Sequence, residues 1–232
     1  IYFNMVPILL TFWPFMETLL EKNKKYLGKY PADEEVKIQR NIMTTMNAIG
    51  TIILVLIYFK TQNNMVFVAT ILYPLIFYIY DAYYIWFNNK NNKGFHYIIH
   101  HLAGIYLLQC IYFTSGDIRN KNLIVLMCVE LSNLPLYYVY HFLKVNNKKD
   151  LNYYEKLINL KRVQLSIYGI LRIVISGYIL FQIFKDVKHK PIFTSSMILI
   201  YLMGAYWLQH QIKGYFITKK EYNDLLALEA KV

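Results

Sequence analysis

The chain has 232 residues, with 25 Lys and Arg against 14 Asp and Glu, so its formal net charge is +11. Apolar residues make up 56% and charged residues 17%, whereas soluble domains average about 45–50% and about 25%. This composition excludes a disordered chain, and the two cysteines exclude a disulfide framework. The cations occur in short clusters between long apolar runs, which indicates a membrane protein and not a nucleic-acid-binding protein.

Seven apolar segments of about 16–23 residues approach the length of about 20 residues that crosses a bilayer. In chain order they cover residues 5–20, 43–59, 66–87, 96–114, 122–143, 163–184 and 192–212. The first segment contains Pro14 and Glu17, and a cleaved signal peptide is the alternative for it. No basic region precedes this segment and no small-residue cleavage site follows it, so we expect a true span.

The distribution of Lys and Arg predicts the orientation of these spans. The segments after spans one, three, five and seven contain 18 cations, and the segments on the opposite side contain 6. Because basic residues favour the cytosolic side, the C-terminus is expected in the cytosol and the N-terminus in the lumen. Arg172 is the one cation that falls within a span.

A few ionisable residues interrupt the apolar segments, where a charge costs about 2.5–3.5 kcal/mol at mid-bilayer. They are Asp81, His96, His100, His101, Glu130, His141, Arg172 and His210. At 1.5 Å per residue, the histidines and Asp81 fall in the cytosolic third of the bilayer. His96 and His100 share one helical face and His101 points about 100° away, so at least one of the neighbouring pair should face the bundle interior.

Glu130 and Arg172 fall deeper, near mid-membrane, within about one helical turn of each other. We expect a buried ion pair in which each charge offsets the desolvation of the other. The alternative is that Glu130 orients a histidine, since it lies on nearly the same helical stripe as His141.

Three kinds of chemistry could use these residues. The cluster from His96 to His101 resembles a fragment of the histidine boxes of di-iron enzymes, but six histidines are too few for that site. A zinc site would need three or four ligands, and only His100, His141 and His210 offer such a set, so no metal is predicted. A histidine beside a carboxylate suits general-base catalysis or nucleophilic acyl transfer.

Five motifs spread along the chain resemble the TLC domain, which is shared by translocating-chain-associated membrane proteins, ceramide synthases and CLN-type lipid proteins. They are Tyr80-Asp81, His100-His101, Glu130-Leu131-Ser132-Asn133, Gly169-Ile170-Leu171-Arg172, and Tyr206-Trp207 followed by Ile212-Lys213-Gly214. The resemblance covers about residues 36–216, which we take as the TLC domain. Residues 1–35 would form a first span with a basic cytosolic loop, and residues 217–232 a cytosolic tail.

The resemblance implies an all-α, polytopic bundle of about seven transmembrane helices, located in the endoplasmic reticulum, with a cavity for an acyl chain. In ceramide synthases the equivalents of His100 and His101 transfer a fatty acyl group from acyl-CoA to a sphingoid amine. By this resemblance His100, His101, Asp81 and Glu130 are candidate catalytic residues. We add Arg172 and His141 as candidate lipid-binding residues, and acyl-CoA is the one possible co-substrate.

The segment around Glu130 differs from ceramide synthases, which have a His-Asp step and a second Asp three residues later. Here Glu130 replaces the first acid and Asn133 the second. The Glu-Leu-Ser form is more similar to the non-synthase branches, whose members affect phospholipid composition or act as lipid-linked receptors. The leading hypothesis is a protein that binds or handles acyl lipids and influences membrane lipid composition. The alternatives are an acyl-CoA-dependent N-acyltransferase and a non-enzymatic secretory-pathway chaperone or cargo receptor.

Overall fold

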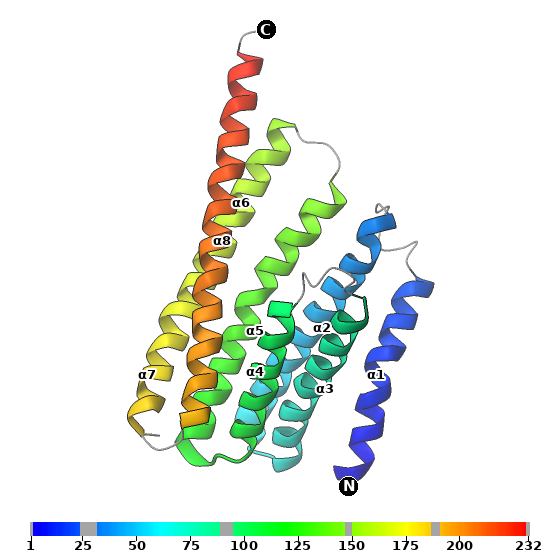
Figure 1. Cartoon of the computed structure of the whole chain (residues 1–232), viewed down its shortest axis with the longest axis vertical. Coiled ribbons are helices and arrows are strands. Elements are labelled where there is room, and N and C mark those ends of the chain that lie inside the picture. Colours follow the sequence, from blue (N-terminus) through cyan, green and yellow to red (C-terminus); the bar gives the residue numbers. More distant parts are fainter. Residues whose placement is uncertain (1, 24–31, 89–94, 147–149, 187–190, 231–232) are drawn as a thin grey trace.

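A computed structural model describes residues 2–23, 32–88, 95–146, 150–186 and 191–230 of the chain. These residues form seven continuous helices that run side by side (Figure 1). Their bounds are α1 Tyr2–Lys22, α2 Ala32–Thr61, α3 Asn64–Asn88, α4 Phe95–Tyr112, α5 Gly116–Val145, a sixth helix made of α6 Leu151–Tyr168, η2 Gly169–Ile175 and α7 Ser176–Asp186, and α8 Pro191–Glu229. The prediction of an all-α bundle with seven helical segments is confirmed.

Four helices within the described residues are long and apolar enough to cross a membrane. They comprise Lys37–Thr61, Asn64–Phe87, Gly116–Val145 and Leu151–Lys185. The apolar part of α4, Tyr97–Tyr112, is shorter. Single prolines inside α3 and α5 do not end these helices, because packing against neighbouring helices stabilises a helix that a proline interrupts.

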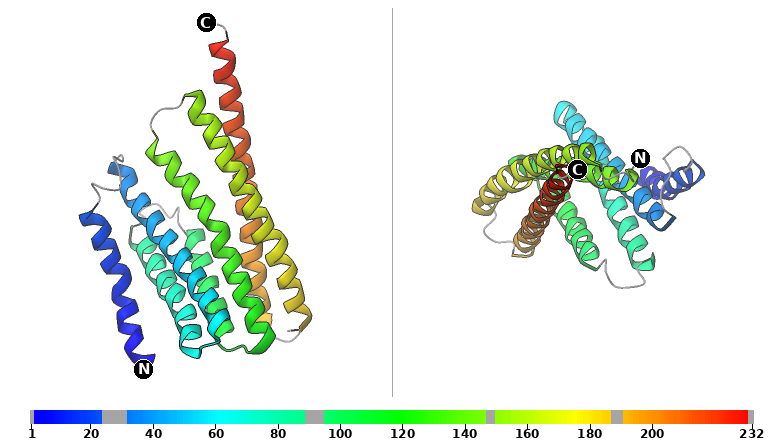
Figure 2. Two further views of the ribbon diagram at one scale, coloured as in Figure 1. Left: turned by 180° about the vertical axis from the view of Figure 1, so that it is seen from behind. Right: turned by 90° about the horizontal axis from the view of Figure 1, so that it is seen from above.

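Six helices form a closed ring in the order α2, α3, α4, α8, α6 and α5, in which each helix contacts the next. Helix α1 lies outside this ring and packs on α2 and α3, as the view from above in Figure 2 shows. Trp13 of α1 is fully buried against the rings of Tyr73 and Phe77. The interior of the bundle is therefore built by residues 32–229.

The two ends of the bundle differ. The end drawn uppermost in Figure 1 contains the starts of α2, α4 and α6 and the ends of α3, α5 and α8. Most Lys and Arg residues of the described helices lie in the parts of α2, α5, α6 and α8 at this end. Apolar side chains of α2, α3, α4, α5, α7 and α8 pack the opposite end solidly, among them Tyr58, Phe67, Ile111, Leu123 and Ile183. We call the two ends the basic end and the apolar end.

One segment of the sixth helix departs from α-helical geometry. Residues Gly169–Ile175 form a π-helix, and the Ser176 hydroxyl donates to the Leu171 carbonyl oxygen at 2.8 Å. Such short π segments are rare and often occur at functional sites. This segment contains Arg172, so the extra residue per turn sets the direction in which the buried guanidinium points.

The last helix is longer than the predicted final span. Helix α8 continues without a break to Glu229, beyond the other helices (Figure 1). Most of the predicted tail, residues 217–232, is therefore a straight extension of α8. Lys161 of α6 fastens the beginning of this extension, because its ammonium donates to the Gly214 carbonyl and to the Thr218 hydroxyl.

Candidate functional site

A cavity of about 920 Å³ occupies the ring interior and extends to the basic end. This volume is within the range of about 300–1,000 Å³ typical of small-molecule sites. Toward the basic end its lining is polar, and toward the apolar end it is lined by Leu107, Leu108, Val125, Leu126 and Ile200. The ring thus encloses a space with one polar and one apolar end.

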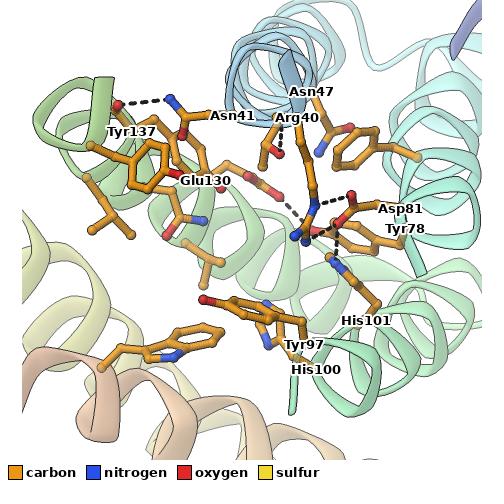
Figure 3. A pocket seen from close by; sticks show the side chains of 18 of the residues that line it. Arg40, Asn41, Asn47, Tyr78, Asp81, Tyr97, His100, His101, Glu130 and Tyr137 are labelled. Carbon is orange, nitrogen blue, oxygen red and sulfur yellow. Dashed lines mark hydrogen bonds and ion pairs between the residues drawn. The ribbon is translucent and has the colours of Figure 1, made fainter. Parts of the chain in front are cut away.

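Arg40, Asp81 and His101 form a cluster on one wall of this cavity (Figure 3). The Arg40 guanidinium donates from Nε and Nη2 to the two Asp81 oxygens at 2.7 and 2.8 Å. His101 Nε2 lies 2.7 Å from Asp81 Oδ2. Because Asp81 is only 2% exposed, this pairing on both oxygens stabilises a carboxylate that burial would otherwise disfavour.

Glu130 lies beside this cluster and accepts a hydrogen bond from the Tyr78 hydroxyl at 2.6 Å. The Tyr78 ring packs against the His101 ring with centroids 5.3 Å apart. Glu130 is 2% exposed and lines the cavity (Figure 3). Two acidic groups from α3 and α5 therefore flank one histidine of α4, as the sequence hypothesis of a histidine beside a carboxylate requires.

The expectation of a direct ion pair between Glu130 and Arg172 is wrong, since no oxygen of Glu130 lies within 4.0 Å of a guanidinium nitrogen of Arg172. Arg172 instead donates from Nη1 to the Asn133 amide oxygen at 3.1 Å, and the Asn133 amide in turn hydrogen-bonds Glu130. The physical reason is helical rotation. Asn133 lies almost one turn beyond Glu130 on α5 and therefore stands between the two charges.

Arg172 itself lies behind the cavity wall. It is 2% exposed, and its guanidinium lies 5.5 and 5.7 Å from the ring centres of Tyr168 and Trp207. The guanidinium is not among the groups that line the cavity. Its assignment as a lipid-binding residue stays a prediction; its guanidinium donates to Asn133 and lies near these two rings.

Both members of the neighbouring histidine pair face the interior, which confirms the expectation for the helical faces of α4. The His100 ring meets the Trp207 ring edge-on at 4.8 Å, and Tyr97 stacks on the same ring at 6.1 Å. These contacts join α4 to α8 and close the ring. The side chain of His96 lies outside the described residues.

The other two histidines are separated by the fold. His210 of α8 lines the cavity at the basic end, whereas His141 of α5 is half-buried and does not line it. No three His, Cys, Asp or Glu side chains of the described residues are close enough to hold a metal ion. The hypothetical zinc set of His100, His141 and His210 is therefore not assembled, and the role of His141 stays a prediction.

Sequence reasoning missed several residues of this site. Arg40 was counted only as a cation of a basic loop, but α2 begins eight residues earlier, so Arg40 lies two turns inside the helix. Asp81 in an apolar segment was a signal that some cation must lie nearby. No comparable signal pointed to Tyr78, Lys161, Gln164 and Gln211, because uncharged or helix-end residues are common in such positions.

The arrangement has a clear chemical consequence. A carboxylate that accepts from Arg40 on both oxygens is ionised and can only accept, so His101 must donate its Nε2 proton to Asp81. In the neutral ring Nδ1 is then the basic nitrogen, and this atom has no hydrogen-bond partner in the structure. Nδ1 of His101 can therefore accept a hydrogen bond or a proton from another group in the cavity.

Fold and site together define a helical bundle with four candidate membrane-spanning helices around an amphipathic internal cavity. No protein-family model matches the chain, and no curated protein matches it in sequence.

Proposed function

We propose that this chain is a multi-pass membrane protein of the TLC family that binds or handles acyl lipids and thereby influences membrane lipid composition. The observation that supports this proposal best is the amphipathic cavity inside the ring of six helices. Its polar end suits a lipid headgroup, and its apolar end suits a hydrocarbon chain. A soluble polar ligand would leave the apolar end without a partner.

The dimensions of the cavity fit a chain-like ligand. On α8 the lining extends from Gly214 to Ile200, which is about 21 Å at the helical rise of 1.5 Å per residue. On α5 it extends from Leu143 to Val125, about 27 Å by the same rise. The space is therefore long in the direction of the helices, as an extended acyl chain requires.

The motifs on which the family resemblance rests are consistent with the proposal. Asp81, His100, His101 and Glu130 come from three helices, yet all four side chains line the same cavity. Placement in the endoplasmic reticulum, with the basic end toward the cytosol, is part of the same proposal, and the excess of Lys and Arg at that end supports it.

A second candidate function is acyl-CoA-dependent N-acyl transfer, which the contact between His101 and Asp81 favours. In that reaction a histidine base removes a proton from an attacking amine, and the amine nitrogen bonds to the thioester carbonyl carbon. The carbon–sulfur bond then breaks and the thiolate leaves with a proton returned by the imidazole. His100 and His101 both reach the cavity in which such a thioester would lie.

A third candidate is a chaperone or cargo receptor of the secretory pathway whose cavity is merely filled by lipid. This candidate predicts that the histidines do not influence lipid composition. The test is the double variant His100→Ala/His101→Ala, with Tyr138→Ala as a control that removes an exposed ring outside the cavity. We expect the double variant, accumulated to normal levels, to change cellular lipid profiles, whereas an unchanged profile would support the third candidate.

Purified protein distinguishes the lipid-binding function from the acyltransferase. Labelled acyl-CoA is supplied with long-chain amines, and the amide product is measured. Product that is formed by the wild type and by Tyr138→Ala but not by His100→Ala would establish the enzyme. Lipid retained through purification, with no amide formed, is the result expected for a lipid-binding protein.

A further inference from the structure

A second polar region lies across the cavity from the cluster of Arg40, Asp81 and His101. It consists of Lys161 and Gln164 on α6 and of His210 and Gln211 on α8, and all four residues line the cavity. We call these four residues the α6–α8 wall. None of them belongs to the motifs on which the family resemblance rests, and the proposed function assigns them no role.

The register of the two helices brings these residues to one level. Lys161 donates to Gly214 and Thr218, and the Tyr168 hydroxyl donates to the Gly204 carbonyl, so α6 and α8 run antiparallel in a defined register. In this register Gln164 stands opposite Gln211. The four side chains are therefore neighbours on one wall rather than scattered along the cavity.

Both glutamines have buried amide atoms without a hydrogen-bond partner. Gln164 is 4% exposed and its Oε1 atom is unpaired, and both amide atoms of Gln211 are buried without a partner. A buried polar group without a hydrogen bond costs free energy, so such groups normally have partners. Each amide also has an NH₂ group, which can donate to a ligand in the cavity.

Lys161 provides a positive charge with neutral partners. Its ammonium donates to the Gly214 carbonyl at 2.8 Å and to the Thr218 hydroxyl at 2.6 Å. No carboxylate of the described residues lies within 4.0 Å of it, and Glu221 acts on it only from farther away. An ammonium has three N–H donors, so one donor is left for a ligand.

The cations on the opposite wall, in contrast to Lys161, are paired with carboxylates. Arg40 is neutralised by Asp81, and Lys37 by Glu34 at 3.3 Å. The α6–α8 wall is thus the part of the cavity where a positive charge, two amides and an imidazole are not matched by an acid. The donors of the ammonium and the two amides fit a group with several acceptor oxygens and negative charge.

We propose that the α6–α8 wall binds the phosphate ester of an amphiphilic ligand, whose hydrocarbon chain then extends toward Leu126 and Ile200. This inference rests on the proposed lipid-binding function and names the headgroup class. A phosphate offers more acceptor oxygens and more charge than a carboxylate, which matches the donors of Lys161, Gln164 and Gln211. The phosphate can belong to a phospholipid or to the soluble carrier of an acyl thioester.

The test compares two lipids that differ only in the phosphate, phosphatidic acid and diacylglycerol with the same acyl chains. The full-length protein is placed in nanodiscs that contain both lipids, and the bound lipid is measured by native mass spectrometry after release. We expect the wild type to select phosphatidic acid at least tenfold. A separate competition with coenzyme A, and with inorganic phosphate, determines whether a soluble phosphate ester occupies the same wall.

Three variants isolate the wall. The double variant Gln164→Leu/Gln211→Leu removes buried amide atoms that have no hydrogen-bond partner, so it should fold normally. It should lose most of the selectivity for phosphatidic acid. Lys161→Met should also lose this selectivity, although loss of the hydrogen bonds to Gly214 and Thr218 lowers the stability of this variant. Lys156→Met is the control, since it removes an equal charge from an exposed position on α6 that does not line the cavity.

The outcomes separate the two proposals. Equal binding of both lipids by the wild type, or selectivity that persists in the glutamine and Lys161 variants, would overturn the phosphate site while leaving lipid binding intact. Binding of neither lipid would contradict the proposed function itself. Coenzyme A that displaces phosphatidic acid from the wild type but not from Lys161→Met would support the site and identify the soluble carrier as an alternative source of the phosphate.

Discussion

Asp81 holds His101 at 2.7 Å while the same carboxylate is bound by Arg40 on both oxygens. Arg40 keeps the Asp81 carboxylate ionised, and this carboxylate in turn determines which nitrogen of the His101 ring has the proton. Three helices meet at this one carboxylate. The cluster therefore determines both the packing of α2, α3 and α4 and the chemistry available to His101.

The first prediction concerns the stability that the Arg40–Asp81 pair provides. Asp81→Leu should lower the free energy of unfolding by about 3 kcal/mol, near the lower limit for a broken buried pair, because the Arg40 side chain is 31% exposed. The double variant Arg40→Met/Asp81→Leu should regain most of this loss, since it leaves no unpaired charge. Thermal unfolding in detergent measures both, and additive losses would contradict the explanation.

The second prediction concerns close packing between α2 and α3. A Cβ atom at Gly50 would lie 2.6 Å from the Tyr73 ring, which also packs against Trp13. Gly50→Ala should therefore destabilise the protein by about 1–3 kcal/mol. In the control Gly169→Ala the new methyl group meets nothing within 4 Å, so we expect a gain of up to about 1 kcal/mol from helix propensity. Equal effects of the two changes would disprove the packing argument.

The third prediction concerns the apolar end of the cavity. Leu126→Trp fills part of the space into which an acyl chain would extend. The lipids that copurify should shift to shorter chains or decrease in amount, as mass spectrometry of extracted lipids would reveal. Leu131→Trp is the matched control on the same helix, because Leu131 is 37% exposed and does not line the cavity. An unchanged chain-length distribution in Leu126→Trp would argue against a chain in this region.

The fourth prediction concerns pH. Lys144 of α5 donates to Glu34 of α2 at 2.8 Å, and this hydrogen bond lowers the pKa of Glu34 below its ordinary value of 4.5. A carboxyl group whose pKa is lowered by folding stabilises the fold above the unfolded value and loses this effect as pH falls through the folded value. The wild type should thus exceed Glu34→Gln in stability by up to about 1 kcal/mol at pH 7.

This difference should disappear as pH falls below 4.5. Melting temperatures of both proteins, measured across pH 3 to about 8, provide the comparison. Glu155→Gln serves as the control, since Glu155 is exposed and forms no ion pair within the described residues. A difference between the wild type and Glu34→Gln that stays constant over this range would rule out the assigned pair.

The fifth prediction concerns orientation. Gln62 directly follows α2 at the apolar end of the bundle, and Glu155 lies in the second turn of α6 at the basic end; both are exposed. In sealed microsomes an impermeant thiol reagent should label Glu155→Cys from the cytosolic side and leave Gln62→Cys unlabelled until the membrane is opened. The wild type, whose two cysteines are half-buried and buried, provides the background. The reverse pattern would invert the topology derived from the distribution of Lys and Arg.

Much of the fold could be predicted from local sequence. The seven apolar segments correspond to the seven helices because length and hydropathy are properties of a single stretch of chain. Helix ends were predicted less well. The predicted second span begins at residue 43, whereas α2 begins at Ala32, since a helix continues beyond the membrane wherever polar residues permit it. This difference explains why Arg40 was overlooked.

The candidate site was predicted only in part. The histidine pair, Asp81 and Glu130 are exceptional in apolar segments, so composition identified them, and all four line the cavity. Gln164 and Gln211 are not exceptional near helix ends. Their significance depends on the missing hydrogen bonds, which can be recognised only after α6 and α8 are packed together.

The sequence by itself determined that this chain is a basic, apolar, all-α protein whose ionisable residues gather toward one end of its helices. Tertiary structure alone decided which of them meet: Asp81 pairs with Arg40 and His101, and Asn133 separates Glu130 from Arg172. The physical reason is that charge and hydropathy are local to a segment. The rotation and register of one helix against another depend instead on the packing of every helix around the ring.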